Sequence, residues 1–194
     1  MKKTLIFGLV GTILLLTAVG MVILSRVAIV RNEENALSIV EELWSVIPSA
    51  KTAIPDDRAN TEMPSLELNG TDFCGIIEIP SVDCVLPISA RWDEHNIEKY
   101  PHRFFGSVYN KSLIIGASDN KAQFDFLKTI SPGDKVFITD VTGARYVFSV
   151  DTIEKSDSVD FEYLSSLDSD LILFAKNTYG FDYTLIRCTS SLGA

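Results

Sequence analysis

Residues 111–134 read KSLIIGASDNKAQFDFLKTISPGD, and the elements expected in this stretch form the centre of the predicted fold. The apolar run at residues 112–116 predicts a buried strand. After a short loop, the spacing of Phe124 and Leu127 predicts an amphipathic helix. A Ser-Pro-Gly-Asp turn then leads into another strand. We interpret Ser118, which lies between the first strand and the helix, as a hydroxyl that caps the helix.

Further strands are predicted on both sides of this stretch, and most of them alternate apolar and polar residues or end at prolines and glycines. They comprise residues 73–80, 84–88, 135–139, 144–150, 171–174 and 183–188. The third and fourth form a β-hairpin with one buried face, and the last two lie across a turn that contains Gly180. Many short strands with few helices predict a mainly β fold, a closed or nearly closed barrel.

Residues 1–31 are predicted to form a membrane anchor. Two lysines precede residues 4–25, which carry no charge before Arg26. About 20 apolar residues suffice to cross the hydrocarbon core, so we expect residues 4–25 to contact the membrane as a transmembrane helix. The alternative is a cleaved signal peptide with a small-residue site at residues 18–20, but the apolar run is longer than is usual for one.

The remainder of the chain is strongly acidic. Residues 32–194 hold all 26 Asp and Glu but 13 of the 17 Lys and Arg, which gives a net charge of −13. This balance excludes nucleic acid as a partner, because binding to phosphates requires cationic groups. Two basic residues flank each side of the apolar run, so the Lys/Arg count alone leaves the orientation undecided. The acidic domain favours a single-pass arrangement with the N-terminus inside and the domain outside.

Residues 32–70 are predicted to form an amphipathic helix followed by a linker. Apolar residues recur in the helix at spacings of three and four: Leu37, Val40, Trp44 and Ile47. Pro48 ends the helix, and residues 49–70 are rich in Pro, Asp, Asn, Thr and Ser with little periodicity. We interpret the helix as a stalk that packs on the domain or lies near the membrane; a partner-binding helix is the alternative.

The order of these segments resembles the sortase family of Gram-positive transpeptidases, classes B and D in particular. GIIEIPSVDCVLPIS at residues 75–89 is similar to the family's opening Gly-x-x-x-Ile-Pro strand and the strand ending in Leu-Pro that follows. RFFGS at residues 103–107 is similar to the Gly-Ser entry to the family's central strand. The resemblance covers residues 73–188 and implies a sortase-like barrel at residues 71–194, outside the cell membrane.

The resemblance also implies three catalytic groups: a cysteine that attacks the peptide carbonyl, a histidine that protonates the leaving amine and an arginine that stabilises the oxyanion. None of them is at the matching position. Ala117 follows Gly116 where the family has Gly-His. Lys176 occupies the cysteine position, and Tyr183 occupies the arginine position, or Thr184 if the loop differs by one residue.

No other residue is predicted to replace these groups. Cys188 lies at a strand position that the family also fills with cysteine, so we expect it to pack in the core, and Cys74 and Cys84 lie in the opening strands. His95 and His102 are interpreted as solvated loop histidines. Three cysteines do not suggest a disulfide framework, and we predict neither a metal site nor a cofactor.

These substitutions imply a catalytically inactive sortase that binds a peptide or scaffolds a cell-surface assembly. The expected partners are a sorting-signal peptide, a pilin or an active sortase. The alternative is an active cysteine transpeptidase or hydrolase with rearranged residues such as Lys176, Cys188 or Tyr183. An attack by Lys176 on an amide carbonyl would form another amide without turnover, so we expect binding rather than catalysis.

Overall fold

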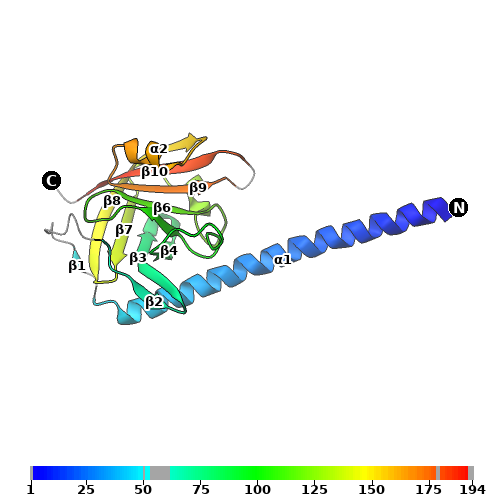
Figure 1. Ribbon diagram of the computed structural model, residues 1–194, viewed down its shortest axis with the longest axis horizontal. Helices are drawn as coiled ribbons and strands as arrows, with labels where there is room; N and C mark the ends of the chain where they lie inside the picture. Colours follow the sequence, from blue (N-terminus) through cyan, green and yellow to red (C-terminus); the bar gives the residue numbers. More distant parts are fainter. Residues whose placement is uncertain (1, 50, 53–61, 178–179, 192–194) are drawn as a thin grey trace.

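The computed structural model describes residues 2–49, 51–52, 62–177 and 180–191, and it consists of a long N-terminal helix attached to a β-barrel (Figure 1). The strands are β1 (Lys51–Thr52), β2 (Leu66–Leu68), β3 (Thr71–Ile79), β4 (Cys84–Ser89), β5 (His102–Phe105), β6 (Leu113–Ser118), β7 (Lys135–Asp140), β8 (Ala144–Ser156), β9 (Leu171–Lys176) and β10 (Tyr183–Ser190). The α-helices are α1 (Lys2–Val46) and α2 (Phe161–Ser166), and the 3₁₀-helices are η1 (Pro80–Val82) and η2 (Asp125–Lys128).

Eight of these strands pair in a closed ring and form the barrel. The order is β3-β7-β8-β10-β9-β6-β5-β4, and β4 pairs with β3 again. β1 adds to β8, and β2 adds to β3, outside the closed ring. The predicted mainly β fold with a closed barrel is therefore confirmed, and closure leaves the eight strands with few free edges.

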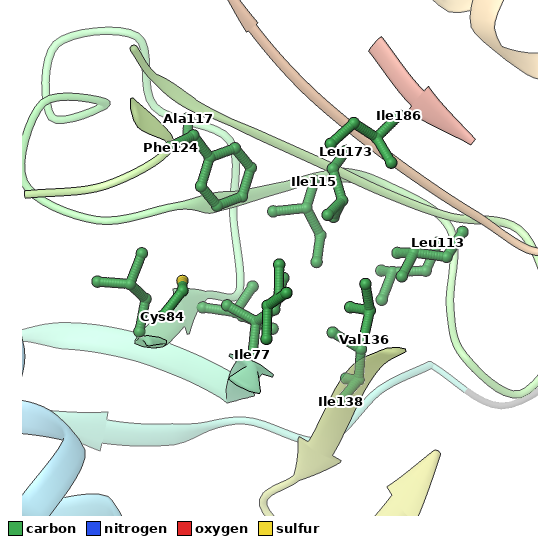
Figure 2. Packing of buried hydrophobic residues seen from close by; sticks show 14 of the residues in the cluster. Ile77, Cys84, Leu113, Ile115, Ala117, Phe124, Val136, Ile138, Leu173 and Ile186 are labelled. Atoms are coloured by element: carbon green, nitrogen blue, oxygen red, sulfur yellow. The ribbon is translucent and has the colours of Figure 1, made fainter. Parts of the chain in front are cut away.

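Three adjacent strands, β6, β9 and β10, are covered on both faces. β6 runs parallel to β9, and all but the last residue of each is buried, as expected for parallel strands with both faces covered. Inward-facing Ile115 and Leu173 pack in the barrel core, which Figure 2 shows from close by. Outward-facing Ile114 and Ile172 pack under Leu164 of α2. The outer face of β6 and β9 is therefore exposed only at the ends of these strands.

The amphipathic helix predicted around Phe124 and Leu127 is wrong: this segment forms the single 3₁₀ turn η2. Asn120 explains the difference, because its side-chain oxygen accepts the N–H of Ala122, and its carbonyl accepts the N–H of Gln123. Such local bonds compete with a regular helix. The prediction that Ser118 caps a helix is also wrong, since Ser118 ends β6 and η2 has no side-chain cap.

The predicted anchor and amphipathic helix form one unbroken helix, α1, whose N-terminal part is apolar, uncovered and long enough to cross a membrane (Figure 1). Its C-terminal part packs on the barrel through Ala36, Ile39, Val40 and Leu43, and Ile47, just after the helix, is buried with them. The predicted stripe was partly wrong, because Leu37 is 51% exposed and Leu43 is fully buried. α1 ends at Val46, one residue before the predicted end at Ile47 and two residues before Pro48.

Part of the predicted linker belongs to the barrel. β2 lies within residues 49–70 and pairs with β3, and Met63 is buried in the core. Residues 50 and 53–61 lie outside the described part of the chain.

We predict that Leu43→Ala lowers the free energy of unfolding by about 2–5 kcal/mol, the usual cost of a cavity in a packed core. Leu43 is fully buried against Ile39, Ile47, Phe73 and Ile76, so its removal loosens α1 from the barrel. Thermal and urea unfolding of the full chain in detergent micelles measures this change. The matched control, Leu37→Ala, should change stability by less than about 0.5 kcal/mol; equal effects would contradict the packing.

Candidate cleft at the ends of β6, β9 and β10

The outward-facing residues of β6, β9 and β10 lie in rows across the three strands, because paired residues in a sheet point to the same face. Gly116 pairs with Phe174, and Phe174 pairs with Leu185. In the next row, Ser118 pairs with Lys176, and Lys176 pairs with Tyr183. We call Ser118, Lys176 and Tyr183 the terminal row. It lies where α2 no longer covers the sheet.

The terminal row opens into a cleft of about 920 Å³. Its floor is aromatic: the ring of Phe104 lies 5.0 Å from that of Trp92 and 5.5 Å from that of Phe174, both edge to face. The ring of Tyr183 lies 6.4 Å from that of Phe174. A cleft with an apolar aromatic floor and a few polar groups is typical of a ligand-binding site.

Gly116 makes this aromatic packing possible. A Cβ atom built on Gly116 would lie 2.5 Å from Cζ of Phe174 and 2.6 Å from Cζ3 of Trp92. Only a residue without a side chain lets both rings approach the strand so closely.

Two of the three positions matched to the catalytic residues point into the cleft. Lys176 is exposed and Tyr183 is half-buried there. Ala117 also borders the cleft, but it is buried with the barrel core, and Figure 2 shows it beside Phe124. Ser118 is therefore the β6 residue opposite Lys176. Thr184 belongs to a different row, opposite Ala175, and its hydroxyl donates to Oδ1 of Asn177 at 2.9 Å.

The rim of the cleft is acidic. Four exposed carboxylates line the cleft together with Lys176: Glu94, Glu98, Asp157 and Asp160. The hydroxyl of Ser158 and the N–H of Tyr163 both donate to Asp160, and these bonds lower the pKa of its carboxyl. Among the described residues, no cluster of three or more His, Cys, Asp or Glu is arranged to hold a metal ion. The rim thus favours a cationic ligand.

None of the three cysteines lines this cleft. All are free and buried, and burial raises the pKa of the Cys74 and Cys84 thiols from 9.0 to about 12. Burial, helped by the nearby Asp151 carboxylate, also raises the pKa of Cys188. Cys188 packs in the core opposite Leu171, as predicted. A nucleophilic cysteine needs an accessible thiolate, and these surroundings favour the opposite.

The two histidines also lie outside the cleft. His95 is exposed in a loop, as predicted. The same prediction for His102 was wrong: it begins β5, is 2% exposed, and its Nδ1 lies 2.8 Å from the carbonyl oxygen of Arg91. Pairing of His102 with Gly116 of β6 places the ring under the preceding loop, where Nε2 lies 3.3 Å from the carbonyl oxygen of Asn96. Both ring nitrogens are therefore occupied by backbone groups.

Arg187 does not replace the missing arginine. It lies four residues beyond Tyr183 on β10, opposite Ile172, and its Nε donates to Oγ of Ser169 at 2.9 Å. A second nitrogen donates to the carbonyl oxygen of Asp168 at 2.9 Å. These bonds hold the guanidinium beside the loop before β9, away from the terminal row.

Solved structures match the chain over most of its length. Sortase A from Corynebacterium diphtheriae is 19% identical with a TM-score of 0.55, and the match covers 86% of this chain and 85% of that one. Sortase C1 of GBS Pilus Island 1 is 20% identical with a TM-score of 0.54, covering 87% and 85%. The chain has the sortase fold.

The similarity to solved sortases is not confined to a single sortase class. A sortase D5 transpeptidase from Clostridium perfringens, 17% identical with a TM-score of 0.53, covers 64% of this chain and 82% of its own. The matches thus span classes A, C and D, and the predicted assignment to classes B and D is not supported. No family model and no curated protein matches the sequence. At these identities the likeness establishes the fold and not the activity.

We predict that Gly116→Ala lowers the free energy of unfolding by about 1–3 kcal/mol, because overpacking forces the rings of Trp92 and Phe174 apart. Tryptophan emission should shift to longer wavelength as Trp92 gains water. Ser118→Ala is the matched control on the same strand, since its bonds are made by the backbone. Equal stability and emission in the two variants would contradict the described packing of the floor.

The buried thiols predict a loss of stability at high pH. Their pKa is higher in the folded than in the unfolded state, so the stabilisation is complete below about pH 9 and is lost as the pH rises toward 12. The Tm should fall across this window, and Cys84→Ala should make the fall shallower. At pH 8, iodoacetamide should label the denatured chain at three sites and the native chain at none. Rapid native labelling would contradict the burial.

Proposed function

We propose that this chain is a membrane-anchored pseudo-sortase that binds a peptide in the cleft without cleaving it. It would lie in the cell membrane of a Gram-positive bacterium as a single-pass protein, with the barrel outside. The observation that carries the proposal is the terminal row. By the resemblance, Lys176 and Tyr183 supply an ammonium and a phenol where a sortase has its thiol and guanidinium. The β6 residue that faces them is Ser118, a hydroxyl, while Ala117 at the histidine position is turned into the core.

The loss of catalysis follows from the chemistry of these groups. Peptide cleavage needs a nucleophile, a group that protonates the departing amine and a donor to the oxyanion. Among the described residues that line the cleft there is no cysteine, histidine or arginine. Catalytic groups of this kind act as a unit, so the loss of one removes most of the rate. We propose that Ala117, Lys176 and Tyr183 stand at the former catalytic positions.

Binding does not need these groups. The aromatic rings of Trp92, Phe104 and Phe174 supply apolar contact surface for a side chain of the peptide. The four rim carboxylates against Lys176 favour a peptide with a lysine or arginine. One neighbour is a sortase C from Clostridium perfringens solved with the C-terminal cell wall sorting motif. By analogy, the proposed partners are a sorting-signal peptide, a pilin or an active sortase, and the role is to scaffold a cell-surface or pilus assembly.

The anchored arrangement is supported by α1. Its apolar N-terminal part is long enough to cross a membrane and contacts no other described part of the chain. The barrel that follows is acidic, which opposes contact with nucleic acid. The C-terminal part of the same helix packs on the barrel, so anchoring would hold the cleft close to the cell surface.

The pairing of Ser118 with Lys176 favours one rival function, an acyl transferase or hydrolase that uses a serine and a lysine. A lysine acts as a general base when its surroundings remove it from water. The side chain of Lys176 is exposed, and no hydrogen bond or ion pair joins its ammonium group to a described residue. The active cysteine enzyme is a weaker rival, because Cys188 is buried outside the cleft.

We predict that capped pentapeptides with a central lysine bind the cleft and change the emission of Trp92. Trp44→Phe leaves Trp92 as the single tryptophan of the chain. Phe104→Ala should weaken binding at least tenfold because it removes part of the floor. The adjacent Phe105→Ala is the matched control, since Phe105 packs on Phe161 outside the cleft and should bind as before.

Intact-mass measurements of the full chain, after incubation with the same peptides, separate binding from catalysis. The proposal predicts unchanged protein and peptide masses. A covalent adduct on Ser118 or Cys188, or peptide fragments lost on Ser118→Ala or Cys188→Ala, would instead establish an active enzyme. Equal binding of lysine and glutamate peptides would contradict the role of the acidic rim.

A further inference from the structure

α1 joins the apolar span to the barrel without a break. Between Gly20 and Pro48 the helix contains neither glycine nor proline, the residues that most often bend helices. Leu43 and Ile39 fix its C-terminal part on the barrel by full or nearly full burial. The helix is therefore stiff, and we call it the strut. The orientation of its membrane-spanning part fixes the orientation of the barrel relative to the bilayer.

The barrel meets this strut close to the end of the apolar span. Nδ2 of Asn32 donates to the carbonyl oxygen of Glu98 at 3.0 Å. Arg26 and Arg31 are the first charges after the apolar run. From Arg26 to Asn32 a helix rises about 9 Å, so the loop that carries Glu98 lies within roughly 10 Å of the membrane boundary.

This loop also forms one side of the cleft. Glu94, Ile97 and Glu98 of this loop line the cleft, as does Phe181, which lies between β9 and β10. Phe181 is 96% exposed. In Figure 1 the joined ends of β9 and β10 lie on the side of the barrel that faces the N-terminal half of α1. The cleft end of the barrel thus faces the membrane end of the helix.

We propose that α1 holds this end of the barrel on the bilayer surface, with Phe181 among the lipid headgroups. The inference rests on the proposed anchoring. An exposed phenylalanine gains free energy when its ring is buried at the boundary between the headgroups and the acyl chains, as the apolar residues of membrane-surface segments are. The rim carboxylates Glu94 and Glu98 would be repelled by anionic lipid, so the fitting partner is a zwitterionic surface such as phosphatidylcholine. A ligand would then enter the cleft along the membrane surface.

Site-specific fluorescence tests this contact in the full chain, reconstituted in phosphatidylcholine nanodiscs. The native cysteines are buried, so bimane can be attached selectively at Phe181→Cys. The matched control is Thr189→Cys, an exposed site that lies roughly 20 Å farther along β10 than Tyr183. Lipids with a spin label on the headgroup should quench the label at position 181 at least threefold more than the label at position 189.

A hinge variant tests whether the strut causes the contact. Replacing residues 28–30 with three glycines should at least halve the quenching at position 181, because the barrel is then free to rotate. Equal weak quenching at both positions, or quenching unchanged by the hinge, would overturn the inference. Failure to enter nanodiscs would overturn it together with the proposed anchoring. Peptide binding is measured separately in detergent. Neither the loss of the membrane contact nor failure to enter nanodiscs would therefore contradict the proposed peptide binding.

Discussion

The pairing of β9 with β6 on one side and β10 on the other is the constraint on which the rest of the structure depends. This register decides which side chains fill the barrel and which reach the outer face. A shift of one residue would exchange the two sets. With the observed register, Ala117 and Ala175 pack inside, and the terminal row of Ser118, Lys176 and Tyr183 faces the cleft. The fold and the contents of the cleft therefore have one physical cause.

The same constraint separates the packing of the barrel from the residues that line the cleft. The barrel core and the cluster under α2 supply the packing of the fold, and of the terminal row only Tyr183 packs against that cluster. The cleft keeps its aromatic floor, which Gly116 permits by its missing side chain. The three buried cysteines contribute packing and no accessible thiolate. The described residues that line the cleft combine a shape suited to binding with no cysteine, histidine or arginine.

Sequence patterns predicted the strands well because alternation and apolar runs are local signals. Through the resemblance they also assigned Lys176 and Tyr183 to one site. They failed on the burial of His102, which depends on a loop distant from β6 in the sequence, and on the turn after Asn120, where local side-chain and backbone bonds replace the expected helix. Counting positions along a motif does not show which face a side chain takes. Trp92 and Phe104 gave no signal either, because they meet Phe174 through the barrel's closure.

Disulfide formation between introduced cysteines measures the register most directly. Lys176→Cys with Tyr183→Cys places two thiols side by side on the outer face, within the Cα separation that a disulfide spans. Ala175→Cys with Tyr183→Cys places them on opposite faces. The described register predicts rapid oxidation of the first pair in the full chain and none of the second. Oxidation of the second pair alone would mean a slipped β9, with different residues in the cleft and no basis for the proposed pseudo-sortase.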